Sequence, residues 1–207
     1  MRRLPIYILI DCSAAMAGEP IQAVNSGLTV VRDTMRMDPN TNETAWLSVI
    51  TFGSDAKQIV PLTEAVQFQP PVLTAGGSRA LGSVLKKVVE CVENEVVKGT
   101  KEKKGDWRPI VFIITCGEPT DDYKSGIQEF KKCKWGQVVV YVVGSDANIE
   151  NFHEITENVV AFSSTDTTVF ADFLKWLWID AGTEVKETTG SCNVHELPPP
   201  PPEISFV

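Results

Sequence analysis

Short apolar runs alternate along the chain with segments in which apolar residues recur at helical spacing. Uninterrupted apolar runs are typical of parallel strands buried on both faces, and a spacing of three or four residues is typical of a helix with one buried face. Their alternation predicts a parallel sheet covered by helices. The expected strands are residues 4–11, 46–52, 56–62, 109–115, 137–143 and 158–162.

Helices are expected between these strands, and the turn between the second and third strands is short. Only Gly53-Ser54-Asp55 separates those two strands, so they should form a hairpin with one antiparallel edge strand. The fold class predicted is α/β, with a doubly wound, mostly parallel sheet and helices on both faces. The expected helices begin after Gly18, at Leu81, near Asp121-Asp122 and at about Thr167, the last ending near Gly182.

The composition changes at Thr183, which divides the chain into a domain, 1–182, and a tail, 183–207. With 207 residues, 43% of them hydrophobic, the chain can form one full core. Five consecutive prolines, 198–202, predict a polyproline II spacer in the tail. The apolar residues after them, up to Val207, could dock in an aromatic groove or add a strand to a partner's sheet. A disordered end is the alternative.

Charge and cysteine content narrow the class of partner. The net charge of -8 and the isoelectric point near 4.8 give nucleic acid no general electrostatic reason to bind, so proteins or cations are the expected partners. The acidity could also serve only solubility. The five cysteines, an odd number without zinc-binding spacing, predict reduced thiols in a cytoplasmic protein.

No segment suggests a membrane anchor or a leader. The apolar run Leu4–Ile10 closes on Asp11 instead of on a small-residue cleavage site. No apolar run approaches the roughly 20 residues that a membrane span needs.

The first expected strand ends in Asp11-Cys12-Ser13-Ala14-Ala15, which resembles the Asp-x-Ser-x-Ser motif of von Willebrand factor A (vWA) domains. That motif belongs to a metal-ion-dependent adhesion site (MIDAS). The similarity extends over nearly the whole chain, and it is strongest to the TerY-like subfamily of bacterial tellurium resistance proteins. The segments that carry this subfamily resemblance are 2–7, 18–21, 47–52, 105–109 and 117–122.

The resemblance implies which ligands a metal site would need. A hard cation such as Mg2+ prefers about six oxygens, and loops at the carboxyl ends of parallel strands can supply them from several segments. In the family these are an Asp and two Ser of the first loop, a Thr of a second loop and an Asp after the fourth strand. One position stays open for a carboxylate of a partner.

This sequence keeps Asp11 and Ser13 and departs at the other three positions. Ala15 replaces the second Ser, Arg79 falls at the Thr position, and Cys116 stands at the place of the second Asp. The register around Arg79 is local, so Ser78 or Thr74 could present a hydroxyl instead. The expected binding face of this degenerate MIDAS comprises Asp11, Ser13, Ala15, Ser78, Arg79, Cys116 and Glu118.

The departures from the MIDAS pattern are connected through their effect on charge. One carboxylate is missing and one guanidinium is added, which shifts the fixed charge by about +2, the charge of the absent ion. We hypothesise that Arg79 takes the metal's place and pairs with Asp11 in a two-bond fork. Alternatively, the site drifted and Arg79 points to solvent. Both interpretations predict that the domain binds no metal cofactor.

Other chemistry receives weaker support. Cys12 and Cys116 would end neighbouring strands, so a redox pair is conceivable, although buried cysteines are usually small apolar residues. Neither His153 nor His195 has a spacing that suggests a catalytic triad with Ser13 or Cys116. Gly76-Gly77-Ser78 lacks the Lys of a phosphate-binding loop and is expected to shape the MIDAS loop.

The resemblance therefore implies a non-enzymatic, protein-binding adaptor of a TerY-type phosphorylation module for tellurium resistance and stress response. A kinase, a phosphatase or both would be its partners, with no role for nucleic acid or membrane. The alternative is an adhesion or sensing domain regulated by Mg2+ or Ca2+, with extra ligands from Glu118, Asp121 or Thr74. An enzyme with thiol chemistry at Cys116 is a third interpretation.

Overall fold

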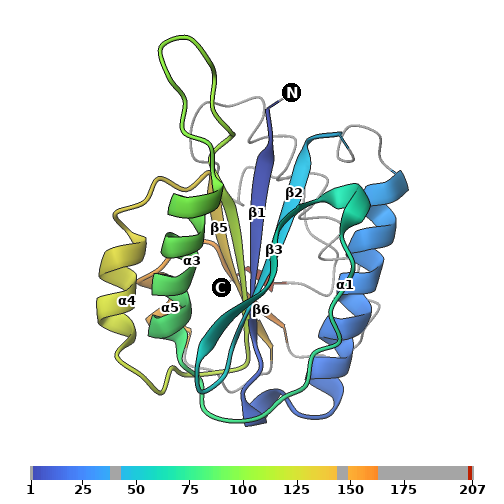
Figure 1. Cartoon of the computed structure of the whole chain (residues 1–207). Coiled ribbons are helices and arrows are strands. Elements are labelled where there is room, and N and C mark those ends of the chain that lie inside the picture. Colours follow the sequence, from blue (N-terminus) through green and yellow to red (C-terminus); the bar gives the residue numbers. More distant parts are fainter. Residues whose placement is uncertain (1, 38–42, 144–148, 163–204, 207) are drawn as a thin grey trace.

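The structure is a computed structural model that describes residues 2–37, 43–143, 149–162 and 205–206 (Figure 1). Its centre is one twisted sheet of seven strands in the order β3-β2-β1-β4-β5-β6-β7. The strands are β1 (Leu4–Asp11), β2 (Ala45–Phe52), β3 (Ala56–Glu64), β4 (Ile110–Thr115), β5 (Gln137–Val143), β6 (Val159–Phe162) and β7 (Ser205–Phe206).

The middle of the sheet is parallel, and β1 lies at its centre. All eight residues of β1 are buried, as are all those of β4 and β5, because helices cover both faces. β1 pairs in parallel with β2 and β4, and the series continues through β5 to β6. As predicted, β3 is an antiparallel edge strand that forms a hairpin with β2.

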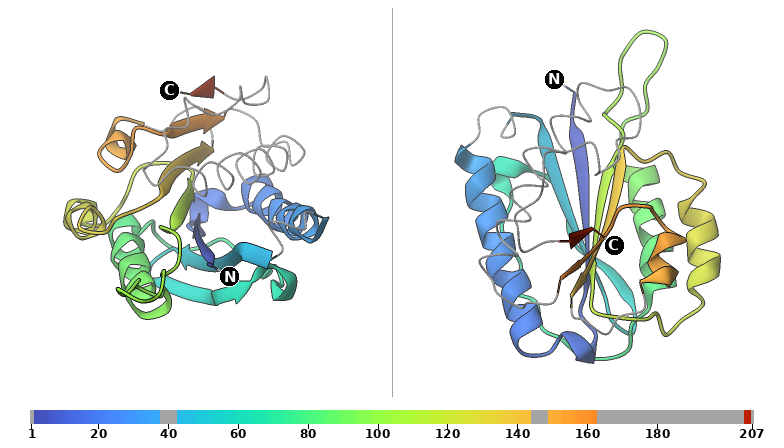
Figure 2. Two further views of the ribbon diagram at one scale, coloured as in Figure 1. Left: turned by 90° about the horizontal axis from the view of Figure 1, so that it is seen from above. Right: turned by 180° about the vertical axis from the view of Figure 1, so that it is seen from behind.

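Helices lie on both faces of the sheet (Figure 2). α1 (Glu19–Met37) covers one face, and its buried residues join the apolar side chains of β1, β2 and β4 that point to that side. α3 (Leu81–Glu95), α4 (Tyr123–Phe130) and the short α5 (Glu150–His153) cover the other. Two 3-10 turns, η1 (Ala14–Met16) and η2 (Ala65–Gln67), complete the described elements.

Two glycines let α3 and α4 approach closely near the carboxyl edge of the sheet. A Cβ on Gly82 would lie 2.5 Å from the carbonyl oxygen of Asp122, and a Cβ on Gly126 would lie 2.5 Å from the carbonyl oxygen of Gly82. Real Cβ atoms are not found at such distances, so any side chain at either position would push the helices apart. This contact fixes the start of α3 against the loop that precedes α4.

Arg3 anchors the opposite, amino edge of the sheet. Arg3 donates to both carboxylate oxygens of Asp106, through Nε at 3.0 and 3.1 Å and through Nη2, and also to the carbonyl oxygen of Glu95 at 2.8 Å. Its guanidinium lies 4.7 Å from the ring centre of Trp46. The start of β1 is thereby tied to the end of α3 and to the connection that leads into β4.

The predicted fold class is confirmed, and each predicted strand is present within a few residues. The third strand continues to Glu64, and the expected helix near 121–122 begins one residue later, after Asp122 caps it. The helix expected at about 167–181 and the domain boundary at 182 lie outside the described residues. Within the described part, no helix has the length and apolar character that crossing a bilayer requires.

The end of the chain differs from the expectation. The sequence predicts that the apolar residues after the prolines dock in an aromatic groove, add a strand to a partner's sheet or form a disordered end. Instead, Ser205 and Phe206 pair with Ala161 and Val160 as an antiparallel strand on this chain's own sheet. An edge strand such as β6 has unpaired backbone groups on its outer side, so at Ser205 and Phe206 pairing within the chain takes the place of pairing with a partner.

Candidate functional site

The site lies where loops meet at the carboxyl ends of β1, β2 and β4. The loop after β1 is held on one side by a hydrogen bond from the Cys12 amide to the Phe52 carbonyl oxygen, 2.7 Å. On the other side, the Cys12 carbonyl accepts from the Gly76 amide at 2.7 Å. These bonds between backbone groups fix the positions of the loops relative to one another.

Gly77 shapes the loop between β3 and α3. Its φ of 83° lies in the left-handed region, and a Cβ there would collide with the Ser54 hydroxyl. The Gly77 carbonyl accepts from the Ala14 amide at 3.0 Å. The segment Gly76-Gly77-Ser78 thus connects the loop after β1 to the turn between β2 and β3. This agrees with the prediction that the segment shapes the MIDAS loop.

The Asp11 carboxylate is at the centre of the site and is completely buried. Its Oδ1 accepts the backbone N–H of Ser13 at 2.8 Å. Its Oδ2 accepts from the Thr115 hydroxyl at 2.9 Å and from Arg79 Nε at 2.8 Å. A buried carboxylate is costly unless it is paired and hydrogen-bonded, and here both oxygens are satisfied.

Arg79 reaches this carboxylate from the residues just before α3, and only 12% of its side chain is exposed. The predicted ion pair is therefore present, and the alternative of an Arg79 that points to solvent is wrong. The predicted two-bond fork is also wrong. The guanidinium gives one N–H to Asp11 Oδ2 and directs two others to the Glu118 carbonyl oxygen (2.6 Å) and to Cys116 Sγ (3.4 Å), whereas Asp11 Oδ1 accepts from the Ser13 amide.

Gly117 provides room for this guanidinium. A Cβ at that position would lie 3.0 Å from Arg79 Nη1, tighter than most real contacts. The absence of a side chain at Gly117 is therefore part of how the loop after β4 accommodates Arg79.

The backbone of Arg79 is fixed from the same loop. The Arg79 amide donates to the Thr120 hydroxyl at 2.9 Å, and that hydroxyl donates to the Arg79 carbonyl at 3.0 Å. Asp121 accepts the amides of Gly82 and Ser83, both at 2.9 Å, so it caps the first turn of α3. The Asp121 carboxylate is thus committed to the helix and not to a metal site.

The other expected residues occupy different places. Ser13 is buried, and its hydroxyl has no hydrogen-bond partner in the described structure. Ala15, Ser78 and Glu118 are exposed around the buried pair, as is Thr74. Glu118 contributes its carbonyl, not its carboxylate, to Arg79. The structure therefore brings Asp11, Ser13, Arg79, Cys116 and the Glu118 backbone together and leaves the other side chains on the surrounding surface.

These residues do not fit the metal that the resemblance implies. In favour of a cation, the buried Ser13 hydroxyl has no hydrogen-bond partner among the described residues. Against it, a guanidinium contacts Asp11 Oδ2, and Cys116 supplies sulfur where a hard cation prefers oxygen. Among the described residues, no three His, Cys, Asp or Glu side chains cluster in a way that could hold an ion.

The thiols of the site are poorly suited to nucleophilic chemistry. Burial raises the pKa of Cys12 to about 11, and the nearby Asp11 carboxylate acts in the same direction. Burial, followed by Asp11, also raises the pKa of Cys116, while Arg79 partly opposes this shift. Both thiols are therefore protonated near neutral pH, and the thiol is a weaker nucleophile than the thiolate. His153 is exposed on α5, and His195 lies outside the described residues.

Sequence reasoning missed Thr115 and Thr120. Thr115 is the last residue of an otherwise apolar strand and is fully buried, so its hydroxyl had to find a partner at the strand end. The sequence therefore contained a signal for Thr115. It contained no signal for Thr120, because the contact of Thr120 with Arg79 depends on how two distant loops meet.

Comparison with known proteins supports the family and the fold. The family model of the von Willebrand factor type A domain matches residues 6–175. No curated protein sequence matches.

Three solved structures illustrate the similarity. A von Willebrand factor type A protein from Catenulispora acidiphila is 16% identical, with a TM-score of 0.67 over 87% of this chain and 43% of its own. Proximal thread matrix protein 1 from the mussel byssus is 18% identical, with a TM-score of 0.62 over 87% and 48%. The ArnB paralog VWA2 from Sulfolobus acidocaldarius is 18% identical, with a TM-score of 0.61 over 84% and 45%.

This chain spans less than half the length of each of these three chains. At such low identity, the structures establish the fold alone. The family model covers more than half of the chain, and the observed topology agrees with it. The chain belongs to the von Willebrand factor type A domain family.

Proposed function

We propose that this domain is a non-enzymatic protein-binding module in which an internal Arg79–Asp11 ion pair stands in for the MIDAS metal. The observation that carries the proposal is the 2.8 Å contact between Arg79 Nε and the completely buried Asp11 carboxylate. The domains of this family commonly mediate protein–protein interactions, and the carboxyl edge of the sheet is where the loops of such a fold gather.

Charge supports this substitution. A doubly charged cation between two carboxylates leaves no net charge, and one guanidinium beside one carboxylate also leaves none. Arg79 also links the loops after β1 and β4, which a metal would otherwise hold together, through Asp11 and the Glu118 carbonyl. The contact face can therefore be kept in shape without an ion.

The surface above the pair has the character of a contact face. Ala14, Ala15 and Ser78 are exposed there, and their small side chains leave the backbone open to close approach by a partner. Glu118 adds an exposed carboxylate at the rim, and Arg79 keeps a small exposed fraction at the centre. We expect a partner to cover this face and to be recognised by shape and hydrogen bonds.

The TerY resemblance supports a finer version of the proposal. The chain would be an adaptor in a cytoplasmic phosphorylation module of tellurium resistance and stress response, with a kinase, a phosphatase or both as partners. This finer version rests on the similar segments 2–7, 18–21, 47–52, 105–109 and 117–122. It is a proposal about the module, whereas the Arg79–Asp11 pair concerns the mode of contact.

Calorimetric titration with Mg2+ tests metal independence. We expect no saturable binding by the unaltered chain, and binding tighter than about millimolar by the triple variant A15S/R79T/C116D, which restores hydroxyl and carboxylate ligands. Circular dichroism checks that the variant folds. Saturable binding by the unaltered chain that disappears in Asp11→Ala would overturn the proposal. That result would favour a metal-regulated adhesion or sensing domain. The unpartnered Ser13 hydroxyl is the observation that supports this alternative.

Affinity capture from the native host tests the contact face and the partner. Ala15→Lys adds bulk and charge to an exposed position without removing an internal contact, and it should abolish capture of the partner. Val72→Lys is the matched control, since Val72 is 89% exposed and belongs to a different surface segment. Mass spectrometry of the captured proteins should identify a kinase or a phosphatase. Equal capture by both variants would show that the partner binds elsewhere.

A further inference from the structure

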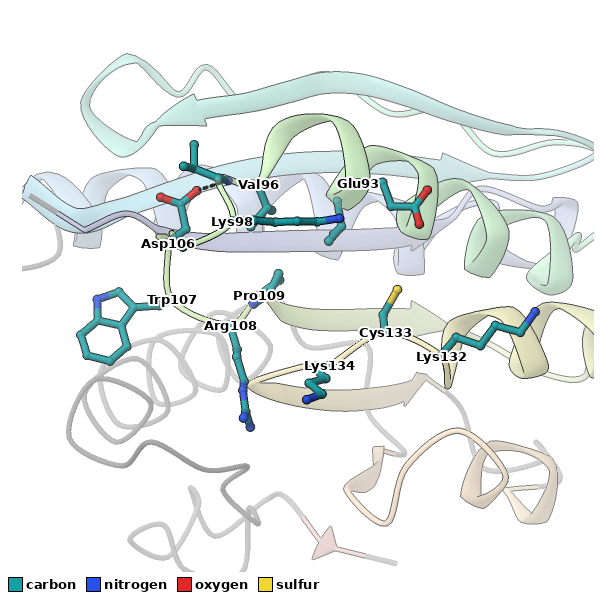
Figure 3. A pocket seen from close by; sticks show the side chains of 13 residues that line it. Glu93, Val96, Lys98, Asp106, Trp107, Arg108, Pro109, Lys132, Cys133 and Lys134 are labelled. Carbon is teal, nitrogen blue, oxygen red and sulfur yellow. Dashed lines mark hydrogen bonds between the residues drawn. The ribbon is translucent and has the colours of Figure 1, made fainter. Parts of the chain in front are cut away.

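A second surface lies at the amino edge of the sheet, at the opposite end of β1 and β4 from Arg79. A cavity of about 520 Å³ opens there between the end of α3, the start of β4 and the connection from α4 to β5 (Figure 3). It is distinct from the Arg79 site. Its lining combines an apolar wall, formed by Val92, Val96, Pro109 and Cys133, with the basic residues Lys98, Arg108, Lys132 and Lys134.

The basic residues form a rim. In Figure 3, Lys98 and Cys133 lie between α3 and the start of β4, while Arg108 and Lys132 extend outward on different sides. Two charged residues of the lining form ion pairs with residues outside it: Asp106 with Arg3, and Lys132 with Glu129. Three positive charges of the lining, on Lys98, Arg108 and Lys134, are then opposed by one negative charge, on Glu93. The cavity therefore has a positive rim on a chain whose net charge is -8.

A lysine-rich loop extends this positive surface. The connection between α3 and β4 projects from the body of the domain (Figure 1). Internal hydrogen bonds hold its base and tip: the Asp106 amide donates to the Val97 carbonyl at 2.9 Å, and the Thr100 amide donates to the Lys103 carbonyl at 2.8 Å. Its exposed lysines, 101, 103 and 104, outnumber its one exposed acidic residue, Glu102, and the cavity lining includes Gly99 and Asp106 at the two ends of the loop. From the sequence this stretch resembles a simple solvated connection, but the fold places it beside a cavity.

We propose that this cavity and the lysine loop form a docking surface for an acidic peptide segment of a partner protein, with one apolar side chain in the cavity. The apolar wall can take an aliphatic side chain, and the rim and loop complement carboxylates that flank it. A nucleic acid would use the positive rim alone, because its backbone has no aliphatic side chain for the apolar wall. Since the two edges lie at opposite ends of the sheet, this partner could bind while another occupies the Arg79 face.

Fluorescence anisotropy with a labelled peptide, Asp-Glu-Leu-Asp-Glu-Leu-Asp-Glu, tests the proposal on the full chain at about 0.15 M salt, where separated surface charges are largely screened. We expect the triple variant K98E/R108E/K134E to bind about tenfold more weakly. The three side chains are exposed, so the variant should fold. The matched control K57E/K86E/K124E makes the same charge change at exposed positions elsewhere and should retain most of the affinity.

Two further measurements decide the class of ligand and its position. A peptide with Gly in place of Leu should bind clearly more weakly, and the Leu peptide should slow iodoacetamide alkylation of Cys133 but not of Cys12, measured residue by residue with mass spectrometry. Equal affinity of the two triple variants, equal affinity of the Gly and Leu peptides, or unchanged alkylation of Cys133 would each overturn the proposal. Tighter binding of a single-stranded oligonucleotide that the rim variant abolishes would also overturn it, in favour of a nucleic-acid surface.

Discussion

Two arginine–aspartate pairs hold opposite ends of the same sheet, and they differ in geometry. At the amino edge, Arg3 meets both oxygens of Asp106 and also stacks near the ring of Trp46. At the carboxyl edge, Arg79 gives a single N–H to Asp11 and directs the remaining contacts to two other groups of the β4 loop. The Asp106 side chain is 6% exposed, and that of Asp11 is not exposed at all.

The difference shows that the same kind of ion pair occurs in two different surroundings. The Arg3 pair is saturated by internal contacts and joins β1, the end of α3 and the entry to β4, which is a structural role. The Arg79 pair also joins loops, but it lies beneath an exposed face of small residues and beside an unpartnered hydroxyl of Ser13. If the Arg79 face is the contact face that we propose, the surroundings of a pair, more than its own chemistry, distinguish a structural clamp from the base of such a face.

Removing Arg79 should have the largest effect on stability. Arg79→Met keeps much of the side-chain volume but leaves the buried Asp11 carboxylate without its counter-charge, and breaking a buried pair in this way costs about 3–5 kcal/mol. Urea denaturation measures the change in unfolding free energy. A loss below about 1 kcal/mol would mean that Asp11 is compensated by other groups, and the contrast between the two edges would disappear.

Arg3→Met should be less damaging. The substitution removes the contacts with Asp106 and with the Glu95 carbonyl, but the Arg3 side chain is 23% exposed, so water can partly replace them. We expect a loss of about 2 kcal/mol in unfolding free energy. Lys132→Ala, which breaks the surface pair with Glu129, is the control and should cost under about 0.5 kcal/mol. If Arg3→Met proves more costly than Arg79→Met, our ranking of the two pairs is wrong.

Thr115→Val tests the support around Asp11. Valine has nearly the same shape but lacks the hydroxyl that donates to Asp11 Oδ2 at 2.9 Å. Since Arg79 and the Ser13 amide remain, we expect a loss of about 1–2 kcal/mol in unfolding free energy. Thermal denaturation together with urea titration would measure it. An unchanged stability would indicate that Arg79 alone satisfies that oxygen.

The thiols of the carboxyl edge should react slowly, an effect that leaves stability untouched. Burial raises the pKa of Cys12 to about 11, so near pH 7.5 its alkylation by iodoacetamide should be at least about a hundredfold slower than that of free cysteine. The rate should climb with pH until about pH 11, because only the thiolate reacts. Peptide-resolved mass spectrometry between pH 7 and 10 measures it. Fast alkylation of Cys12 or Cys116 at neutral pH would favour the interpretation as a thiol enzyme.

Much of the fold could be predicted because each part of the pattern is local. The apolar runs 4–11 and 137–143 are long enough to specify strands, and a three-residue turn, 53–55, can only join antiparallel neighbours. β7 could not be predicted in this way. Two residues are too few to show an alternation of apolar and polar positions, and their pairing with β6 depends on which edge of the finished sheet is left open.

The candidate site shows the same division. By itself, the sequence determined that Asp11 and Ser13 stand at a strand end, because the position of a motif is a property of the chain. The resemblance added the expectation that Arg79 falls at the position of a metal ligand. Only the tertiary structure decided that Asp11 Oδ1 accepts from the Ser13 amide and that Arg79 spreads its hydrogen bonds between Asp11 and the loop after β4. It also decided that Lys98 and Lys134, 36 positions apart, border one cavity. Such outcomes depend on how separate segments meet in space, and no local pattern encodes them.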